Sequence, residues 1–153
     1  MIIGFGCDHA GLELKKELME YLASKGHECI DYSPLKEGEK SDYPIAGRAV
    51  GEAVAAGEVE KGVLVCGTGI GISLTANKVP GVRAAVCSEP FSARMSVCHN
   101  DANIIAVGAR VIGVELAKMI VDEFFSAGFE GGRHQTRVDM IKATEDNYSK
   151  YSF

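Results

Sequence analysis

The sequence of 153 residues predicts an α/β protein with a parallel sheet that helices cover on both faces. Three observations predict this class. Short apolar runs alternate along the chain with segments of helical periodicity, as in repeated βα units. The apolar runs are nearly continuous, which is typical of strands buried on both faces. Polar residues that could carry chemistry follow several of these runs directly, and ligands of such sheets bind beyond the carboxyl ends of the strands.

Five segments are expected to be strands because each is short, apolar and bounded by polar residues or glycine. The first of them ends at a polar turn that begins with Asp8. The third ends in Cys66 and a glycine-rich turn. The expected strands are residues 2–7, 28–32, 62–66, 82–87 and 104–107.

The segments between the strands are expected to form helices. The first helix carries leucines at four-residue spacing and ends at Gly26. Pro90 follows Ser88 and Glu89, a pattern typical of a cap and the first turn of a helix. A further helix is expected directly after the glycine-rich turn that begins at residue 67. The other expected helices are 11–25, 45–56, 114–126 and about 134–148, and the polar segment 33–43 is expected to be a loop.

Length, charge and cysteine content further limit the kinds of protein that this chain can be. The chain has the size of one domain, so residues 1–153 are assigned to a single domain. The net charge of −5 argues against binding to nucleic acid or to an anionic membrane surface. We find neither a transmembrane stretch nor a signal peptide and expect a cytoplasmic protein. Five cysteines without a C-x-x-C pair predict free thiols, with neither a disulfide framework nor a structural zinc site.

The segment Cys66-Gly67-Thr68-Gly69-Ile70-Gly71 is the first candidate for chemistry. Its glycines allow several backbone N–H groups to point at one spot, which makes an anion-binding loop. Such amides stabilise a thiolate at Cys66, the form in which a cysteine reacts. A tight turn with a buried cysteine, or a generic phosphate loop, explains the same pattern. The spacing fits neither a Walker A loop nor a dinucleotide-binding site.

Three other segments offer polar side chains. Asp8 and His9 can transfer a proton or contact an anion, although Asp8 could instead cap the following helix. His99 lies in a polar segment and could equally be a solvated surface residue. Arg133 and Arg137 are four residues apart, so on a helix they share a face and could bind phosphate, or could be ordinary surface arginines. None of the histidines and cysteines has the spacing of metal ligands, so we expect no metal site.

Taken together, these segments resemble the type B ribose-5-phosphate isomerases, whose family also holds the galactose-6-phosphate and allose-6-phosphate isomerases. The matching motifs follow one another in the family's order over residues 2–147. They are Gly6-Cys7-Asp8-His9-Ala10-Gly11, Asp42-Tyr43-Pro44, Cys66-Gly67-Thr68-Gly69-Ile70-Gly71-Ile72-Ser73, Ala76-Asn77-Lys78, Val86-Cys87-Ser88-Glu89-Pro90, His99-Asn100-Asp101-Ala102-Asn103 and Glu130-Gly131-Gly132-Arg133-His134-Gln135-Thr136-Arg137.

The resemblance implies a three-layer, Rossmann-like α/β/α sandwich with five parallel strands. It implies a metal-independent aldose–ketose isomerase of the pentose phosphate pathway that needs no cofactor and interconverts D-ribose 5-phosphate and D-ribulose 5-phosphate. The enzyme is expected to work as a homodimer or a dimer of dimers with active sites shared between subunits. The C-terminal helix and tail, about residues 134–153, are expected at the dimer interface.

The resemblance also implies residue roles. Asp8 and His99 match the pair that opens the sugar ring, with His99 supplied by the neighbouring subunit. Cys66 matches the catalytic base, since Ile72 stands where a second branch of the family carries a glutamate base. Thr68 is the fourth residue of the catalytic set, in the loop that holds the intermediate. The expected substrate-binding residues are His9, Gly67, Gly69, Ile70, Gly71, Asn100, Arg110, Arg133 and Arg137, with Asn100 and Arg110 from the partner subunit and His134 and Ser73 as possible additions.

Two alternatives remain beside this interpretation. The substrate could be allose 6-phosphate or galactose 6-phosphate, because side-chain types do not set the depth of the pocket. The chain could also be a non-catalytic module that binds a phosphorylated ligand. Such a module needs the glycine-rich loop and the arginines, but not a cysteine, an aspartate and a histidine together, and the joint presence of all three favours an isomerase.

Overall fold

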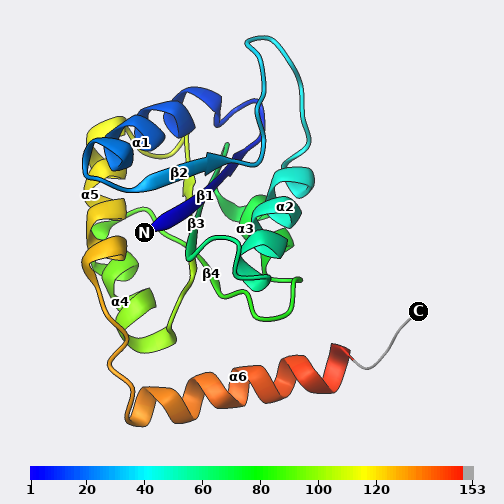
Figure 1. Ribbon diagram of the computed structural model, residues 1–153, viewed down its shortest axis with the longest axis vertical. Helices are drawn as coiled ribbons and strands as arrows, with labels where there is room; N and C mark the ends of the chain where they lie inside the picture. Colours follow the sequence, from blue (N-terminus) through cyan, green and yellow to red (C-terminus); the bar gives the residue numbers. More distant parts are fainter. Residues whose placement is uncertain (150–153) are drawn as a thin grey trace.

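In the computed structural model, which describes residues 1–149, the five strands form one parallel sheet in the order β2-β1-β3-β5-β4, and helices lie on both faces (Figure 1). The predicted fold class is therefore confirmed. The strands are β1 (Ile2–Cys7), β2 (Glu28–Asp31), β3 (Lys61–Cys66), β4 (Ala84–Val86) and β5 (Ile104–Gly108). The helices are α1 (Leu12–Ser24), α2 (Tyr43–Ala55), α3 (Ile70–Ala76), α4 (Pro90–Asn100), α5 (Val114–Ser126) and α6 (Arg133–Ser149).

Each face of the sheet has its own apolar core. Successive residues of a strand point to opposite faces, so Val65 contributes to one core and its neighbours Leu64 and Cys66 to the other. Residues of α1, α4 and α5 complete the larger core, and residues of α2 and α3 complete the smaller one. The sheet therefore has no solvated face, which explains why the strands read as continuous apolar runs.

The element boundaries depart from the predicted ones where side chains replace regular backbone pairing. β4 is shorter than expected because the amide of Arg83 donates to Oδ1 of Asn103 at 2.8 Å, instead of to a neighbouring strand. α2 begins two residues earlier than expected, with Pro44 in its first turn. The start of α4 is capped by Glu89, whose carboxylate accepts from the amide of Ser92 at 2.8 Å.

The strand order reverses between β1 and β3. From β1 the chain passes through α1 to β2 at the edge of the sheet, and then returns through α2 to β3 on the other side of β1. The two connecting helices cover opposite faces, so they diverge at the carboxyl ends of β1 and β3. A crevice at such a reversal is where ligands of open α/β sheets bind. Asp8 and Cys66 stand at the two sides of this point.

The helices α4 and α6 lead the chain away from the crevice. α4 carries the chain from the carboxyl end of β4 back to the amino end of β5, and α6 contacts the end of α4 and crosses the bottom of the molecule (Figure 1). α6 buries Val138 but exposes Met140, Ile141 and Tyr148. Among residues 1–149, no helix has the length and apolar character needed to cross a membrane.

Candidate active site at the carboxyl edge of the sheet

Cys66 is the last residue of β3 and lies at the centre of the carboxyl edge. Its backbone pairs with Gly108 of β5, and its carbonyl accepts from the amide of Ala109 at 2.8 Å. Its sulfur accepts a hydrogen bond from the amide of Gly69 at 3.1 Å. Gly69 makes this contact with φ of 78°, a conformation that favours glycine. The loop therefore directs an N–H dipole at the sulfur, which stabilises a thiolate there.

The Cys66 sulfur is covered by the loop above it. The residue is 3% exposed and belongs to the smaller core, together with Ile72 of α3. Gly69 and Ile72 both follow it closely in the sequence, so the loop and the first turn of α3 form the cover. Access of a ligand to the sulfur therefore depends on the conformation of residues 67–71.

Three of the other cysteines have a raised pKa, which favours the protonated thiol. Burial, and then the nearby carboxylate of Glu89, raise the pKa of Cys87 to about 11. Burial also raises the pKa of Cys7 and of Cys29. All five cysteines are free thiols, as expected. Cys66 differs in having an amide N–H directed at its sulfur.

Part of the loop is occupied with its own hydrogen bonds. The amide of Ile70 donates to Oγ1 of Thr68 at 3.3 Å, and the amide of Gly69 is used by the Cys66 sulfur. Two of the amides expected to bind an intermediate are therefore already engaged within the loop. Ser73 is buried and its hydroxyl donates to the carbonyl of Ile70 at 2.8 Å, so it holds the first turn of α3.

Asp8 follows β1 directly and faces the same crevice. Its Oδ1 accepts from the amides of Ala10 and Gly11 at 2.9 and 3.2 Å, so it does hold the chain at the start of α1. Its Oδ2 has no hydrogen-bond partner among the described residues 1–149, which leaves one carboxylate oxygen for chemistry. His9 is exposed, and its Nδ1 is 3.0 Å from the carbonyl of Ser41, to which it donates.

A buried polar network fixes the end of β1 beside Asp8. Lys15 is fully buried, and its ammonium donates to both carboxylate oxygens of Asp31 at 2.7 Å and to the carbonyl of Ser33 at 2.8 Å. The Ser33 hydroxyl accepts from the amide of Cys7 at 2.7 Å. Because buried charges are stable only when paired, the network holds these segments in one arrangement.

Two further side chains belong to this edge. The guanidinium of Arg110 lies beside Gly67, since a Cβ on Gly67 would be 3.4 Å from its Nη1. Arg110 therefore lies beside the loop of its own chain, and its expected contribution from a partner subunit stays a prediction. The ring of Tyr43 lies against Gly71, where a Cβ would be 2.7 Å from it. Sequence reasoning assigned Tyr43 no role, although the Asp42-Tyr43-Pro44 motif drew attention to it.

The remaining predicted site residues lie at the opposite edge of the sheet. Asn103, just after α4, accepts from the amide of Gly62 at the beginning of β3. The distance along β3 from Gly62 to Cys66 is about 13 Å. His99 and Asn100 end α4, and Glu130 is tied to them because its amide donates to the carbonyl of Cys98 at 3.0 Å. The group at this amino edge comprises His99, Asn100, Arg133, His134 and Arg137.

Within one chain, the predicted site is therefore split into two halves. The carboxyl edge gathers Asp8, His9, Arg110 and the loop from Cys66 to Gly71. The amino edge gathers both arginines of α6 and the two histidines. Arg133 and Arg137 are exposed in the first turns of α6, on the side that leads away from the sheet. The structure does not bring His99 to Cys66 of the same chain.

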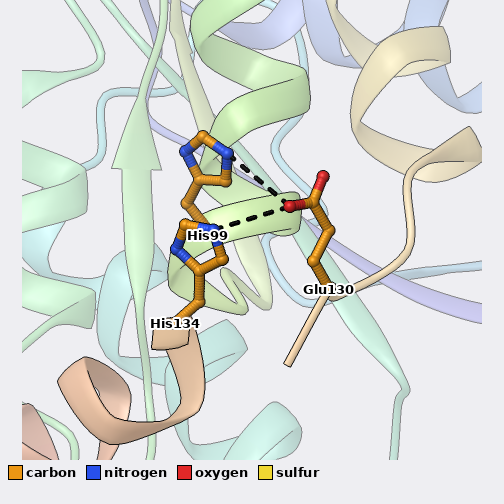
Figure 2. Close-up of side chains that lie close together, drawn as sticks. All are labelled: His99, Glu130 and His134. Atoms are coloured by element: carbon orange, nitrogen blue, oxygen red, sulfur yellow. Dashed lines mark ion pairs between the residues drawn. The ribbon is translucent and has the colours of Figure 1, made fainter. Parts of the chain in front are cut away.

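Three side chains at the amino edge form a cluster that the sequence did not predict. The rings of His99 and His134 stack with centroids 4.2 Å apart and planes 7° apart, and the Glu130 carboxylate lies beside both (Figure 2). Burial, followed by the positive charges of His99 and Arg133, lowers the pKa of His134. The sequence spacing did not reveal this group, because His99 is 31 residues from Glu130 and meets it only through the fold.

Comparisons with known proteins agree with this architecture. A family model described as "Ribose/Galactose Isomerase" matches residues 3–141. The ribose-5-phosphate isomerase B of Escherichia coli (strain K12) is 54% identical over 143 residues, which cover 94% of this chain and 95% of that protein. The structure of Clostridium thermocellum ribose-5-phosphate isomerase B superposes with a TM-score of 0.94 at 52% identity, covering 97% of this chain and 99% of that one.

A second similar structure carries a ligand. Ribose-5-phosphate isomerase B from Mycoplasma genitalium, solved with bound ribulose 5-phosphate, superposes with a TM-score of 0.90 at 37% identity. The superposition covers 95% of this chain and 97% of that one.

Proposed function

The chain belongs to the ribose/galactose isomerase family, and on this premise we propose that it interconverts D-ribose 5-phosphate and D-ribulose 5-phosphate. The observation that carries the proposal is the Cys66 sulfur at the carboxyl edge, with the Gly69 amide directed at it and Asp8 across the strand reversal. A base and a carboxylate at such a crevice are what an aldose–ketose isomerisation requires.

The reaction begins with opening of the furanose ring. One member of the pair Asp8 and His99 takes the proton from the hydroxyl on C1, while the other gives a proton to the ring oxygen. The bond between C1 and the ring oxygen breaks, and the aldehyde forms at C1. The unengaged Oδ2 of Asp8 supports this role, since a general acid or base needs an atom free to reach the substrate.

Proton transfer between C2 and C1 follows. The Cys66 thiolate removes the proton from C2, the electron pair forms the C1–C2 double bond, and O1 becomes an oxyanion. The protonated sulfur returns the proton to C1, and the hydroxyl proton of O2 moves to O1, which leaves a carbonyl at C2. Thr68 and amides of the loop stabilise the oxyanion, and the loss of one such donor typically costs on the order of 10²–10³ in rate.

The phosphate is held away from the reacting carbons. His9, Arg110, Arg133 and Arg137 are its proposed ligands, because guanidinium groups bind phosphate with paired hydrogen bonds. Binding energy at the phosphate then holds C1 and C2 against the sulfur. A six-carbon sugar phosphate would place its phosphate one carbon further away.

The separation of the two edges supports an active site shared between subunits. If Cys66 and His99 act on one sugar, the histidine must come from a second copy of the chain, because within one chain they lie at opposite edges. Exposed apolar residues of α3 and α6, including Ile70, Leu74 and Met140, support burial against such a copy. We propose a homodimer, or a dimer of dimers, with α6 at the interface; residues 150–153 of the proposed interface segment lie outside the described residues.

We place the enzyme in the cytoplasm. Five free cysteines suit a reducing compartment, and a reaction that depends on a free sulfur requires one.

The substrate is tested by steady-state kinetics on D-ribose 5-phosphate, D-allose 6-phosphate and D-galactose 6-phosphate. We expect kcat/KM to be highest for ribose 5-phosphate, by about ten- to a hundredfold, because one additional carbon shifts the phosphate from its arginines. The Cys66→Ala variant, purified in parallel, corrects for contaminating isomerase. A higher kcat/KM on either six-carbon sugar would assign the chain to the galactose or allose branch; the matching family model names galactose beside ribose.

Gly108 tests whether the position of Thr68 matters. A Cβ on Gly108 would lie 2.7–2.8 Å from backbone atoms of Thr68, so Gly108→Ala must push the loop away from β5. We expect kcat to fall about ten- to a hundredfold, with a loss of about 1–3 kcal/mol in the free energy of unfolding. Gly128→Ala is the matched control, because a Cβ there meets no atom within 4 Å. An unchanged kcat in Gly108→Ala would show that the loop position is not critical.

A further inference from the structure

His99, Glu130 and His134 bring three possible metal ligands together at the amino edge. Oε2 of Glu130 is 3.9 Å from Nε2 of His99 and 3.5 Å from Nε2 of His134. The three ligand atoms all lie within 4.8 Å of one another. Figure 2 shows that both rings direct a nitrogen to the side on which the carboxylate lies.

The two contacts of Glu130 have the length of ion pairs and are longer than hydrogen bonds. Hydrogen bonds between nitrogen and oxygen are about 2.7–3.2 Å long, and both contacts exceed that range. Zinc bound tetrahedrally at about 2.0–2.1 Å places neighbouring donor atoms about 3.3–3.5 Å apart. The Glu130–His134 separation already matches, and the Glu130–His99 separation exceeds it by a few tenths of an ångström. The ring planes are 7° apart, so His99, the more exposed of the two, must rotate out of the stack for both nitrogen lone pairs to reach one ion.

The backbone holds the three side chains in this arrangement. The amide of Glu130 donates to the carbonyl of Cys98, which fixes the segment before α6 against the end of α4. Gly131 and Gly132 both have positive φ, at 65° and 55°, and make the turn that places Glu130 and His134 on the same side. This arrangement does not depend on the side chains that it brings together.

The cluster is accessible on one side and supported on the other. The His134 side chain is 9% exposed, whereas those of Glu130 and His99 are 55% and 38% exposed. An ion can therefore enter from solvent against a buried imidazole. Two histidines and a glutamate leave a fourth position open for water, as in zinc sites with three protein ligands.

We propose that His99, Glu130 and His134 bind a divalent transition-metal ion of the zinc class, and that the bound ion inhibits the isomerase. The inhibition rests on the proposed function, in which His99 transfers a proton during ring opening. An imidazole nitrogen that holds a metal cannot carry a proton at the same time. Catalysis itself does not use this ion, so the site is one of inhibition.

Binding is tested first, without reference to activity. The full chain, freed of metal, is titrated with ZnCl₂ by isothermal titration calorimetry and with Co²⁺ by visible absorption. We expect saturable binding that weakens by at least about tenfold in Glu130→Gln, since even the loss of an outer-shell partner costs that much. Glu123→Gln is the matched control, because Glu123 pairs with Arg94 on a neighbouring surface. Equal binding in wild type and Glu130→Gln, or an intense thiolate-to-cobalt band, would overturn the site.

Inhibition is tested second, with the same proteins. We expect Zn²⁺ to inhibit the wild type, EDTA to reverse the inhibition, and EDTA without added zinc to leave turnover unchanged. The Zn²⁺ concentration for half inhibition should rise at least about tenfold in Glu130→Gln and stay unchanged in Glu123→Gln. Zinc binding that is lost in Glu130→Gln but never inhibits would leave the metal site in place and overturn the role of His99. Equal inhibition of wild type and Glu130→Gln would overturn the proposal and place the inhibitory ion elsewhere.

Discussion

Cys66→Ala is expected to lower kcat by about 10²–10⁴-fold, the contribution of a positioned general base. In the proposed reaction, the Cys66 sulfur is the group that takes the proton from C2. Cys66 is not among the proposed phosphate ligands, so KM should change by no more than a fewfold, which is the pattern of an interaction made only in the transition state. Kinetic assays in both directions, with ribose 5-phosphate and with ribulose 5-phosphate as the substrate, measure kcat and KM.

Cys87→Ala is the matched control for this loss. Cys87 also lies near the carboxyl edge, after β4, but burial raises its pKa to about 11, so its thiol stays protonated at neutral pH. We expect kcat of Cys87→Ala to stay within a fewfold of the wild type. If Cys66→Ala retained more than about a tenth of wild-type kcat, the proton would have to be taken by another group and the proposed mechanism would fail.

Mixing His99→Asn and Cys66→Ala subunits is expected to restore activity that neither variant has alone. In a shared site, Cys66 of the His99→Asn chain meets the intact His99 of the Cys66→Ala chain, while the second site of the same dimer lacks both groups. Random reassociation makes half of the dimers mixed, so the mixture should reach about a quarter of wild-type activity. The two chains are refolded together, and turnover is compared with that of each variant refolded separately.

The double variant Cys66→Ala/His99→Asn supplies the control for that experiment. Refolded with His99→Asn, it forms mixed dimers in which no site has both groups, so activity should not recover. Recovery in neither mixture would show that each active site is built from a single chain. That result would require His99 to approach Cys66 within one chain, across the length of β3.

The sequence predicts the carboxyl edge better than the amino edge, for physical reasons. β1 has its predicted bounds because its apolar run stops at Asp8, and the residues that follow parallel strands meet at one edge. β4 was predicted too long, because nothing local reveals that the Asn103 side chain will pair with the amide of Arg83. The local sequence pattern predicts the strands and helices and the edge of the sheet at which the strands end. It does not predict which side chains will hydrogen-bond to backbone groups in place of a neighbouring strand.

The cluster of His99, Glu130 and His134 could not be predicted from the local sequence pattern. His99 lies 31 residues before Glu130, on the other side of α5, and it meets Glu130 and His134 only because α4 returns to the amino edge and two glycines turn the chain before α6. The position of Arg110 beside Gly67 of its own chain was not evident from the sequence for a related reason. Its place beside Gly67 follows from the extension of β5 pairing beyond the last strand residue, where the amide of Arg110 donates to the carbonyl of Gly67 at 3.0 Å.

The cover over Cys66 also bears on oxidative damage. Peroxide and disulfides of small thiols attack a sulfur through its solvent-facing surface, and this one offers almost none. The binding energy of a sugar phosphate at its phosphate group can displace residues 67–71. Hydrogen peroxide has no phosphate group and gains no such binding energy. In the proposed reaction, the same few residues would admit the sugar phosphate and shield the sulfur from oxidants.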